Sequence, residues 1–88
     1  MGYGEVTRTI LEALEKKGAA NHGDIVAETG LPRYLVLAAF HVLHELGMIE
    51  LIYSKGSHKV YRISEKGREY LHSEMITGGE NLEAIEAA

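Results

Sequence analysis

The chain lacks several features that define whole classes of protein. Its 88 residues contain no cysteine, which excludes disulfides and thiolate zinc sites. There is only one proline, and there is no apolar run long enough to span a bilayer. The N-terminus also lacks the basic, apolar and cleavage regions of a signal peptide. We therefore expect a cytoplasmic protein with no membrane partner.

The residue groupings of an enzyme are missing too. We find no nucleophile beside a base, no glycine-rich phosphate cradle and no pair of catalytic carboxylates. His41 and His44 are three residues apart, a spacing that puts two imidazoles on one side of a helix, and Glu45 could add a carboxylate. Two histidines do not make a site, so we expect them to face solvent or phosphate. The sequence predicts a non-enzyme with no metal and no cofactor.

The length indicates one small domain. A chain of 88 residues buries about 60% of its unfolded surface, close to the size at which oligomerisation helps stability. A homodimer is therefore expected, with residues 6–17 and 64–75 and the tail at the interface. We assign residues 1–77 to the folded domain. Gly78 and Gly79 then break the last helix and leave residues 78–88 as an acidic tail.

Helical periodicity appears first near the N-terminus. Glu12 and Lys16 are spaced for an ion pair on the outer side of this first helix, which Gly18 ends. Its inward stripe is Val6, Ile10, Leu11 and Leu14. We expect this helix to serve packing alone.

A helix, a tight turn and another helix follow. Asn21 suits a helix start because its side-chain oxygen can accept backbone N–H groups, while Asp24 faces the positive end of the helix dipole. Gly30 is placed to end that helix, and Pro32 suits the first position of the next, which we expect over residues 32–46. The inward stripe of this third helix is Val36, Ala39, Phe40 and Leu43.

After Gly47 the period changes from helical to alternating. Two alternating runs, residues 49–54 and 59–63, flank a polar connection that contains Gly56, which predicts a β-hairpin. The expected faces are Ile49, Leu51 and Tyr53 on one side of the first strand, Glu50, Ile52 and Ser54 on the other, and Tyr61 with Ile63 on one face of the second. Ser64 then caps a final helix that we expect to reach Met75.

Two stretches resemble a known group of proteins. They are Gly47-Met48-Ile49 and Lys59-Val60-Tyr61-Arg62-Ile63-Ser64-Glu65-Lys66-Gly67-Arg68-Glu69-Tyr70-Leu71. Together they resemble the helix end, wing strand and following helix of small stand-alone winged-helix transcriptional regulators of the MarR, ArsR and PadR type, from bacteria or archaea. The similarity covers about residues 6–75 and does not choose among these families. It implies an α+β winged helix-turn-helix, with a three-helix core, a two-stranded wing hairpin and a C-terminal helix, that binds double-stranded DNA as a dimer.

The distribution of charge agrees with this function, although the net charge is -4. Residues 32–62 hold four basic and two acidic side chains, a net charge of +2, whereas residues 1–31 carry -2 and residues 63–88 carry -4. Negative charge is therefore kept away from the segment that would face phosphates. An ordinary solvated surface is the alternative.

Roles in DNA binding follow from the resemblance and the helical periodicity. The residues expected on the outward side of the third helix are Arg33, Tyr34, Leu37, Ala38 and His41. Arg33 is the best candidate to read guanine or to grip a phosphate, and the Tyr34 hydroxyl could bond a phosphate oxygen. On the wing we expect Lys55, His58 and Lys59 to reach the backbone or minor groove. For Arg62, a DNA contact and a surface salt bridge are equally favoured.

The apolar character of the third helix supports a rival function. Leu35, Leu37, Ala38 and Val42 make it apolar on almost every side, whereas a helix that reads bases usually shows several hydrogen-bonding side chains. The apolar face could contact thymine methyl groups, pack on another subunit or bind a protein partner. The sequence thus leaves a winged-helix protein–protein interaction module as the alternative. It does not say whether a small-molecule or metal effector exists.

Overall fold

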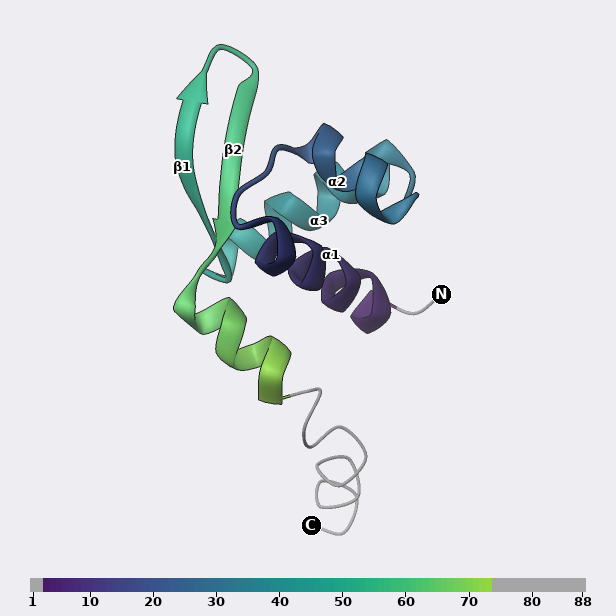
Figure 1. Cartoon of the computed structure of the whole chain (residues 1–88), viewed down its shortest axis with the longest axis vertical. Coiled ribbons are helices and arrows are strands. Elements are labelled where there is room, and N and C mark those ends of the chain that lie inside the picture. Colours follow the sequence, from purple (N-terminus) through teal and green to yellow (C-terminus); the bar gives the residue numbers. More distant parts are fainter. Residues whose placement is uncertain (1–2, 74–88) are drawn as a thin grey trace, which may run out of the picture.

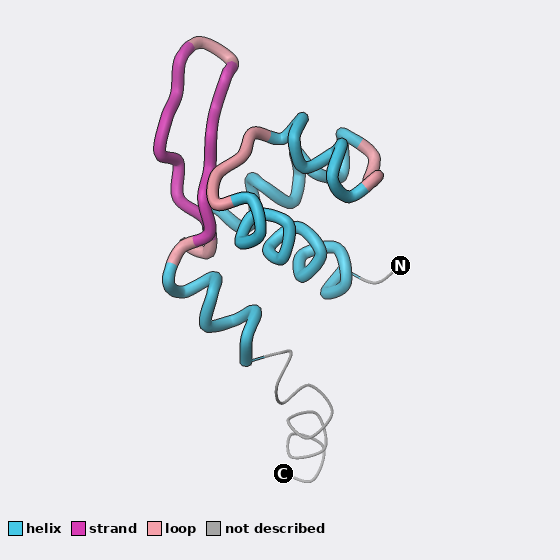
Figure 2. The backbone as a smooth tube through the Cα atoms, viewed as in Figure 1, coloured by secondary structure: helices cyan, strands magenta, loops and turns pink. Residues whose placement is uncertain are grey.

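The computed structural model describes residues 3–73. In chain order it contains helices α1 (Tyr3–Lys17), α2 (His22–Thr29) and α3 (Arg33–Glu45), then strands β1 (Ile49–Lys55) and β2 (His58–Ile63). Residues 65–73 form a further helix. The three first helices pack together, the hairpin projects beside them, and the last helix extends from the opposite end of the hairpin (Figure 1, Figure 2). This is the α+β winged helix-turn-helix that the sequence predicts.

The core lies between the three helices and the base of the hairpin. The α1 stripe predicted from the sequence is buried, as is the inward stripe of α3. Ile49 and Ile63 of the hairpin and Leu71 of the last helix are buried with them. The buried apolar side chains are Val6, Ile10, Leu11, Ala13, Leu14, Ala20, Ile25, Leu31, Val36, Ala39, Phe40, Leu43, Ile49, Ile63 and Leu71. Both predicted helical stripes are thereby confirmed.

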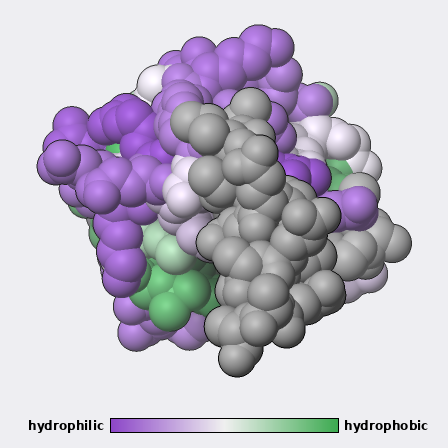
Figure 3. All heavy atoms as spheres, turned by 90° about the horizontal axis from the view of Figure 1, so that it is seen from below, coloured by the Kyte–Doolittle hydropathy of each residue, from purple (hydrophilic) through white to green (hydrophobic). Residues whose placement is uncertain are grey.

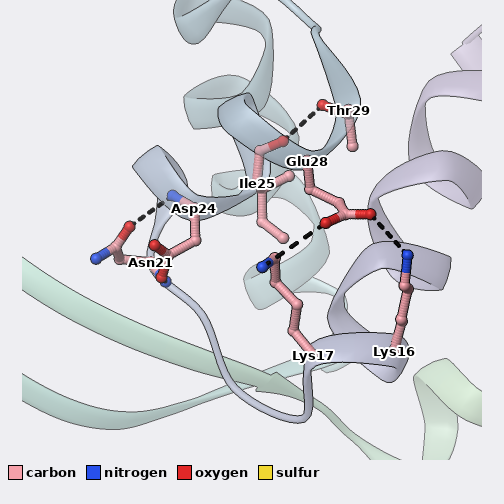
Figure 4. Close-up of polar contacts among 7 residues, drawn as sticks. All are labelled: Lys16, Lys17, Asn21, Asp24, Ile25, Glu28 and Thr29. Carbon is pink, nitrogen blue, oxygen red and sulfur yellow. Dashed lines mark hydrogen bonds and ion pairs between the residues drawn. The ribbon is translucent and has the colours of Figure 1, made fainter.

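Local signals set the helix ends as expected. Asn21 Oδ1 accepts from the Asp24 backbone N–H at 2.8 Å, and Asp24 Oδ2 accepts from the Asn21 N–H at 3.1 Å, which forms a capping box (Figure 4). Gly30 ends α2 with φ of 74°, a conformation that glycine adopts without steric cost. Pro32 is the N-cap of α3, so this helix begins one residue later than predicted.

One predicted ion pair is wrong. Lys16 does not pair along its own helix with Glu12; its Nζ lies 3.0 Å from Glu28 Oε2 on α2, and Lys17 Nζ lies 3.7 Å from Glu28 Oε1 (Figure 4). The hydrogen bond from Lys16, followed by the positive charge of the two lysines, holds the pKa of the Glu28 carboxyl below its usual value. The ion pair therefore links two helices, because α2 packs against the end of α1.

The hairpin differs from a simple alternation. Leu51 pairs with Tyr61, but Tyr53 pairs with Val60, so Ile52 is an extra residue in a β-bulge. Because Tyr61 and Val60 are adjacent, their side chains point to opposite faces, and so do those of Leu51 and Tyr53. The prediction that Tyr53 shares a face with Leu51 is wrong for this reason.

The hairpin is attached to the helices through a third segment. Between α1 and α2, Ala20 forms a bridge with Tyr61 in which each backbone N–H donates to the other's carbonyl oxygen at 2.9 Å. This bridge fixes the base of the wing beside the start of α2. The wing tip, in contrast, extends away from the helical body (Figure 1).

The final helix is held by its first turn. Ser64 Oγ donates to the Gly47 carbonyl oxygen at 2.6 Å and accepts from the Gly67 N–H at 3.0 Å, which confirms Ser64 as a cap. Lys66 Nζ also donates to the Leu46 carbonyl oxygen at 2.8 Å. The predicted helix end at Met75, the domain boundary after residue 77 and the acidic tail of residues 78–88 lie outside the described residues.

Candidate nucleic-acid interface

The outward face of α3 is open to solvent. All five residues predicted there are exposed, with Tyr34 at 75% and Leu37 at 45% of their full accessible area. They are Arg33, Tyr34, Leu37, Ala38 and His41. The other two apolar residues, Leu35 and Val42, are partly buried, and Leu35 packs against the core. The outside of the helix is therefore less apolar than the sequence suggests.

The N-terminal turn of α3 is favourable for negative groups. It has no acidic residue, and Pro32 provides no side-chain cap. Arg33 Nη1 lies 3.8 Å from the position that a Cβ on Gly23 would take, so the guanidinium lies beside the first turn of α2. The helix-turn-helix thus places Arg33 beside the first turn of α2, which also holds the capping residue Asp24.

The wing tip is polar, basic and exposed. Lys55 pairs with His58 across a two-residue turn, in which Gly56 has φ of 61°, as a glycine in the first central position of a tight hairpin turn requires. Lys59 pairs with Ser54 one step further down the strands. The His58 ring also contacts the Tyr53 ring edge to face, with centroids 5.8 Å apart. The structure therefore places the three predicted wing residues together at the tip.

Arg62 is engaged with another residue of the hairpin. Its Nε lies 2.9 Å from Glu50 Oε2, and the two residues are directly paired across the strands. Both side chains are about half exposed. The surface salt bridge considered from the sequence is thus present, while a DNA contact by Arg62 stays a prediction.

Tyr61 determines how the wing sits on α3. Its ring packs edge to face against Phe40 and also against His44, with centroids 5.1 Å and 5.7 Å apart. The sequence predicts that Tyr61 lies on one strand face with Ile63, but it carries no signal for these ring contacts. His44 therefore packs on the wing side of α3, and it is not close to two further ligands. Within residues 3–73, no group of three or more His, Asp or Glu side chains could hold a metal ion.

Acidic residues are absent from the outward face of α3 and from the upper part of the wing. None occurs from Arg33 to His44, and none occurs from Leu51 to Ser64. Glu45 stands at the far end of α3, and Glu50 is paired with Arg62. The first three turns of α3 and the upper wing therefore combine cations with uncharged side chains only.

The described surface is also hollowed away from the outward face of α3 and the wing tip. A polar hollow of about 470 Å³ is lined by residues of both charges, among them Glu15, Arg62 and Arg68. An apolar one of about 210 Å³ lies between the ends of α1 and α3 and the last helix, where Leu46, Met48 and Tyr70 contribute. Among the helices described, none is both long enough and apolar enough to cross a membrane.

Solved structures with the same fold are found, although the sequence itself matches no known family. No family model matches the sequence, and no curated protein matches it. Among solved structures, BpsR of Bordetella bronchiseptica, whose DNA binding is regulated by 6-hydroxynicotinic acid, is similar with a TM-score of 0.75 and 16% identity. That match covers 90% of this chain but only 57% of the BpsR chain.

Two shorter proteins match over nearly their whole length. Sso10a-2, a DNA-binding protein from Sulfolobus solfataricus, has a TM-score of 0.75 and 20% identity, with 99% of this chain and 90% of that chain covered. A PadR family transcription regulator from Clostridium difficile has a TM-score of 0.75 and 18% identity, with coverages of 98% and 97%. At these identities the likeness establishes the winged-helix fold.

Proposed function

We propose that this protein is a transcriptional regulator that binds double-stranded DNA as a homodimer, with α3 in the major groove and the wing on the adjacent backbone or minor groove. The winged-helix fold supports this proposal, because similar structures include a DNA-binding protein and a transcription regulator. Fold alone does not determine function, so the charged and apolar residues on the surface of this chain have to support the proposal as well.

The observation that carries the proposal is the distribution of charge on α3 and the wing. A chain with a net charge of -4 would be repelled by DNA unless its acidic residues were directed elsewhere. Here the outward face of α3 and the wing tip present Arg33, Lys55 and Lys59 with no acidic residue between Arg33 and His44 or between Leu51 and Ser64. Electrostatic repulsion would therefore be lowest for a duplex that meets these two surfaces.

Each exposed residue then has a role of its own. Arg33 would bond a guanine edge or a phosphate, Tyr34 a phosphate oxygen, and His41 either group. Lys55, His58 and Lys59 would follow the phosphate backbone from the wing tip. For Arg62, a phosphate contact would have to compete with its ion pair to Glu50.

A dimer is supported by apolar surface that the single chain leaves open. Figure 3 views the molecule from below and shows apolar atoms gathered on part of an otherwise hydrophilic face. The apolar hollow near Leu46, Met48 and Tyr70 opens between elements that would meet a second copy, and Leu46 is 49% exposed. The apolar stripe of α1 is buried in the core of the chain, so it is not available for a dimer contact. The last helix and the ends of α1 and α3 would form the interface instead. Light scattering at micromolar concentration should then give twice the chain mass of 9.7 kDa.

A second candidate function is a protein–protein interaction module. It is favoured by exposed apolar residues, since Leu51, Ile52 and Tyr53 on β1 are 39%, 45% and 49% exposed and Leu37 on α3 is 45% exposed. Such residues are typical of the centre of a protein interface. A module of this kind would capture its partner through these residues and would not need the cations of the wing.

Binding to duplex DNA at several salt concentrations separates the two functions. A regulator should bind a labelled duplex, and the logarithm of its affinity should fall linearly with the logarithm of the salt concentration as counterions are released. The measurement is a fluorescence anisotropy titration with random and genomic duplexes. No binding at low salt, or binding that salt does not weaken, would remove the DNA function.

A further inference from the structure

The centre of the α3 outward face is apolar although nothing in the fold requires it. Leu37 is 45% exposed and Ala38 is exposed, while the core is closed by the inward stripe of the same helix. Burial within this chain therefore does not explain these two residues. Their apolar character is available for something outside the chain.

Hydrogen-bonding groups on α3 are few and frame this apolar centre. The helix contains no Asn, Gln, Ser, Thr or Lys, so the amide side chains that usually read adenine are missing. By helical spacing, Leu37 lies one turn after Arg33, and Ala38 one turn after Tyr34. His41 begins the following turn. We call Leu37 and Ala38 together the apolar step. Polar side chains thus lie one turn before this step and one turn after it.

The chemistry of the major groove offers one apolar partner for such a step. Thymine carries a C5-methyl group there, and the other groups displayed by the four bases are hydrogen-bond donors and acceptors. Leu37 and Ala38 are consecutive residues and lie about 1.5 Å apart along the helix axis, less than the roughly 3.4 Å between stacked base pairs, so together they would meet one or two base pairs. The cations at Arg33, Lys55 and Lys59 select a polyanion as the occupant of this face rather than an apolar protein surface.

We propose that Leu37 and Ala38 contact thymine methyl groups, so that this protein prefers duplexes with thymine at the centre of each α3 contact. This inference rests on the proposed DNA binding and adds the substrate class to it. Specificity comes from apolar contact with methyl groups, while Arg33 and the wing provide most of the affinity.

Methyl groups can be removed or added without changing any hydrogen bond. Deoxyuridine in place of thymidine removes the C5-methyl, and 5-methylcytosine in place of cytosine adds a methyl at the same place in the major groove. We expect each contacted methyl to change affinity about fourfold, as the burial of one such group implies. Affinity should therefore fall when thymine is replaced by uracil in an A·T-rich duplex. It should rise when cytosine is methylated in a matched G·C duplex.

Two variants assign the effect to the apolar step. Leu37→Ala should retain binding but lose most of the difference between thymine and uracil duplexes. Leu51→Ala, which removes an exposed leucine of the wing, should keep the difference in full. Thermal unfolding followed by circular dichroism verifies that both variants are folded. Because the Leu37 and Leu51 side chains are exposed, we expect neither substitution to disturb the fold.

The outcomes distinguish the inference from the proposed function. Equal binding of thymine and uracil duplexes by the wild-type protein would overturn the inference while leaving DNA binding intact. A difference that persists in Leu37→Ala would also overturn it, because the methyl group would then act through duplex shape or through another residue. Failure to bind any duplex would overturn both proposals and assign the apolar face to a protein partner.

Discussion

Phe40 of α3 and Tyr61 of β2 meet edge to face, with ring centroids 5.1 Å apart and ring planes at 70°. Tyr61 also exchanges two backbone hydrogen bonds with Ala20, which precedes α2. A single strand residue therefore joins the third helix, the wing and the start of the second helix. In the proposed function, this contact sets the position of the wing relative to the helix that enters the groove.

The coupling between these two rings is measurable. In a double-mutant cycle of Phe40→Leu and Tyr61→Leu, we expect a coupling energy of about 0.5–1.5 kcal/mol, the range typical of aromatic pairs in this geometry. Chemical denaturation of the four proteins gives this value. Additive losses of stability in the double variant would mean that the two rings do not stabilise each other.

Gly67 is required by a close approach of backbone segments. A Cβ at this position would overlap the Met48 carbonyl oxygen and would lie 3.0 Å from Ile63 Cγ1. We expect Gly67→Ala to lower the free energy of unfolding by about 1–3 kcal/mol or more, because the last helix must shift from the turn after α3. Thermal or urea unfolding measures the loss.

A matched glycine provides the control. Gly4 also lies in a helix, and a Cβ there would have no atom within 4 Å. Gly4→Ala should therefore leave stability unchanged or raise it by about 0.5–1 kcal/mol through helix propensity. Equal effects of the two substitutions would show that the contact with Met48 is not tight.

The ion pairs of Glu28 predict a dependence of stability on pH. Its hydrogen bond with Lys16, and then the charges of the two lysines, lower its pKa in the folded state, so the stability it contributes is present above the unfolded pKa. This contribution is lost as pH falls through the folded pKa. Glu28→Gln should be less stable than the wild type at pH 7. The difference should shrink as pH falls below the ordinary glutamate pKa of about 4.3 and should vanish once pH lies below the lowered folded pKa.

Salt and a second glutamate test the same ion pairs. Because Glu28 is exposed to solvent, the effect should be small and should shrink further at high ionic strength. Glu12→Gln is the control, since Glu12 has the helical spacing for Lys16 but the structure pairs Lys16 with Glu28 instead. A larger loss of stability in Glu12→Gln than in Glu28→Gln would contradict this pairing.

The helix ends could be predicted from the sequence because they depend on neighbouring residues. Asn21 with Asp24 caps α2 through bonds within one turn, and the left-handed conformations of Gly30 and Gly47 reflect their lack of a Cβ. Helical periodicity likewise placed the outward residues of α3, since it is a property of the helix alone. None of these features needs knowledge of distant segments.

The remaining details depend on contacts between distant segments. Counting back from the turn of the hairpin without a bulge would pair Arg62 with Leu51, whereas the bulge at Ile52 pairs it with Glu50. The bulge has no clear sequence signal, so neither the partner of Arg62 nor the face of Tyr53 could be predicted. The bridge from Ala20 to Tyr61 and the bond from Lys16 to Glu28 likewise require the packed fold.

The wing lysines should act on affinity without acting on sequence preference. The double variant Lys55→Ala and Lys59→Ala should bind all duplexes more weakly, and by a similar factor. The plot of log affinity against log salt concentration should become less steep, with the magnitude of its slope reduced by about 2. Lys16→Ala with Lys17→Ala removes the same charge from α1 and should leave that slope nearly unchanged. Equal slopes for the wild type and the wing variant would show that the hairpin tip does not touch DNA.

Arg33 offers the most direct test of the central claim that α3 meets DNA. Binding of a selected duplex should be compared for the wild type, Arg33→Ala and Arg68→Ala, the last being an exposed arginine on the helix of residues 65–73. If α3 meets DNA, Arg33→Ala should lose about 1–3 kcal/mol of binding free energy and relax preference at one base position. Its circular dichroism should be unchanged, and Arg68→Ala should bind nearly as the wild type. A folded Arg33→Ala protein with wild-type affinity and preference would contradict a role of α3 in reading DNA and would favour the protein-interaction module.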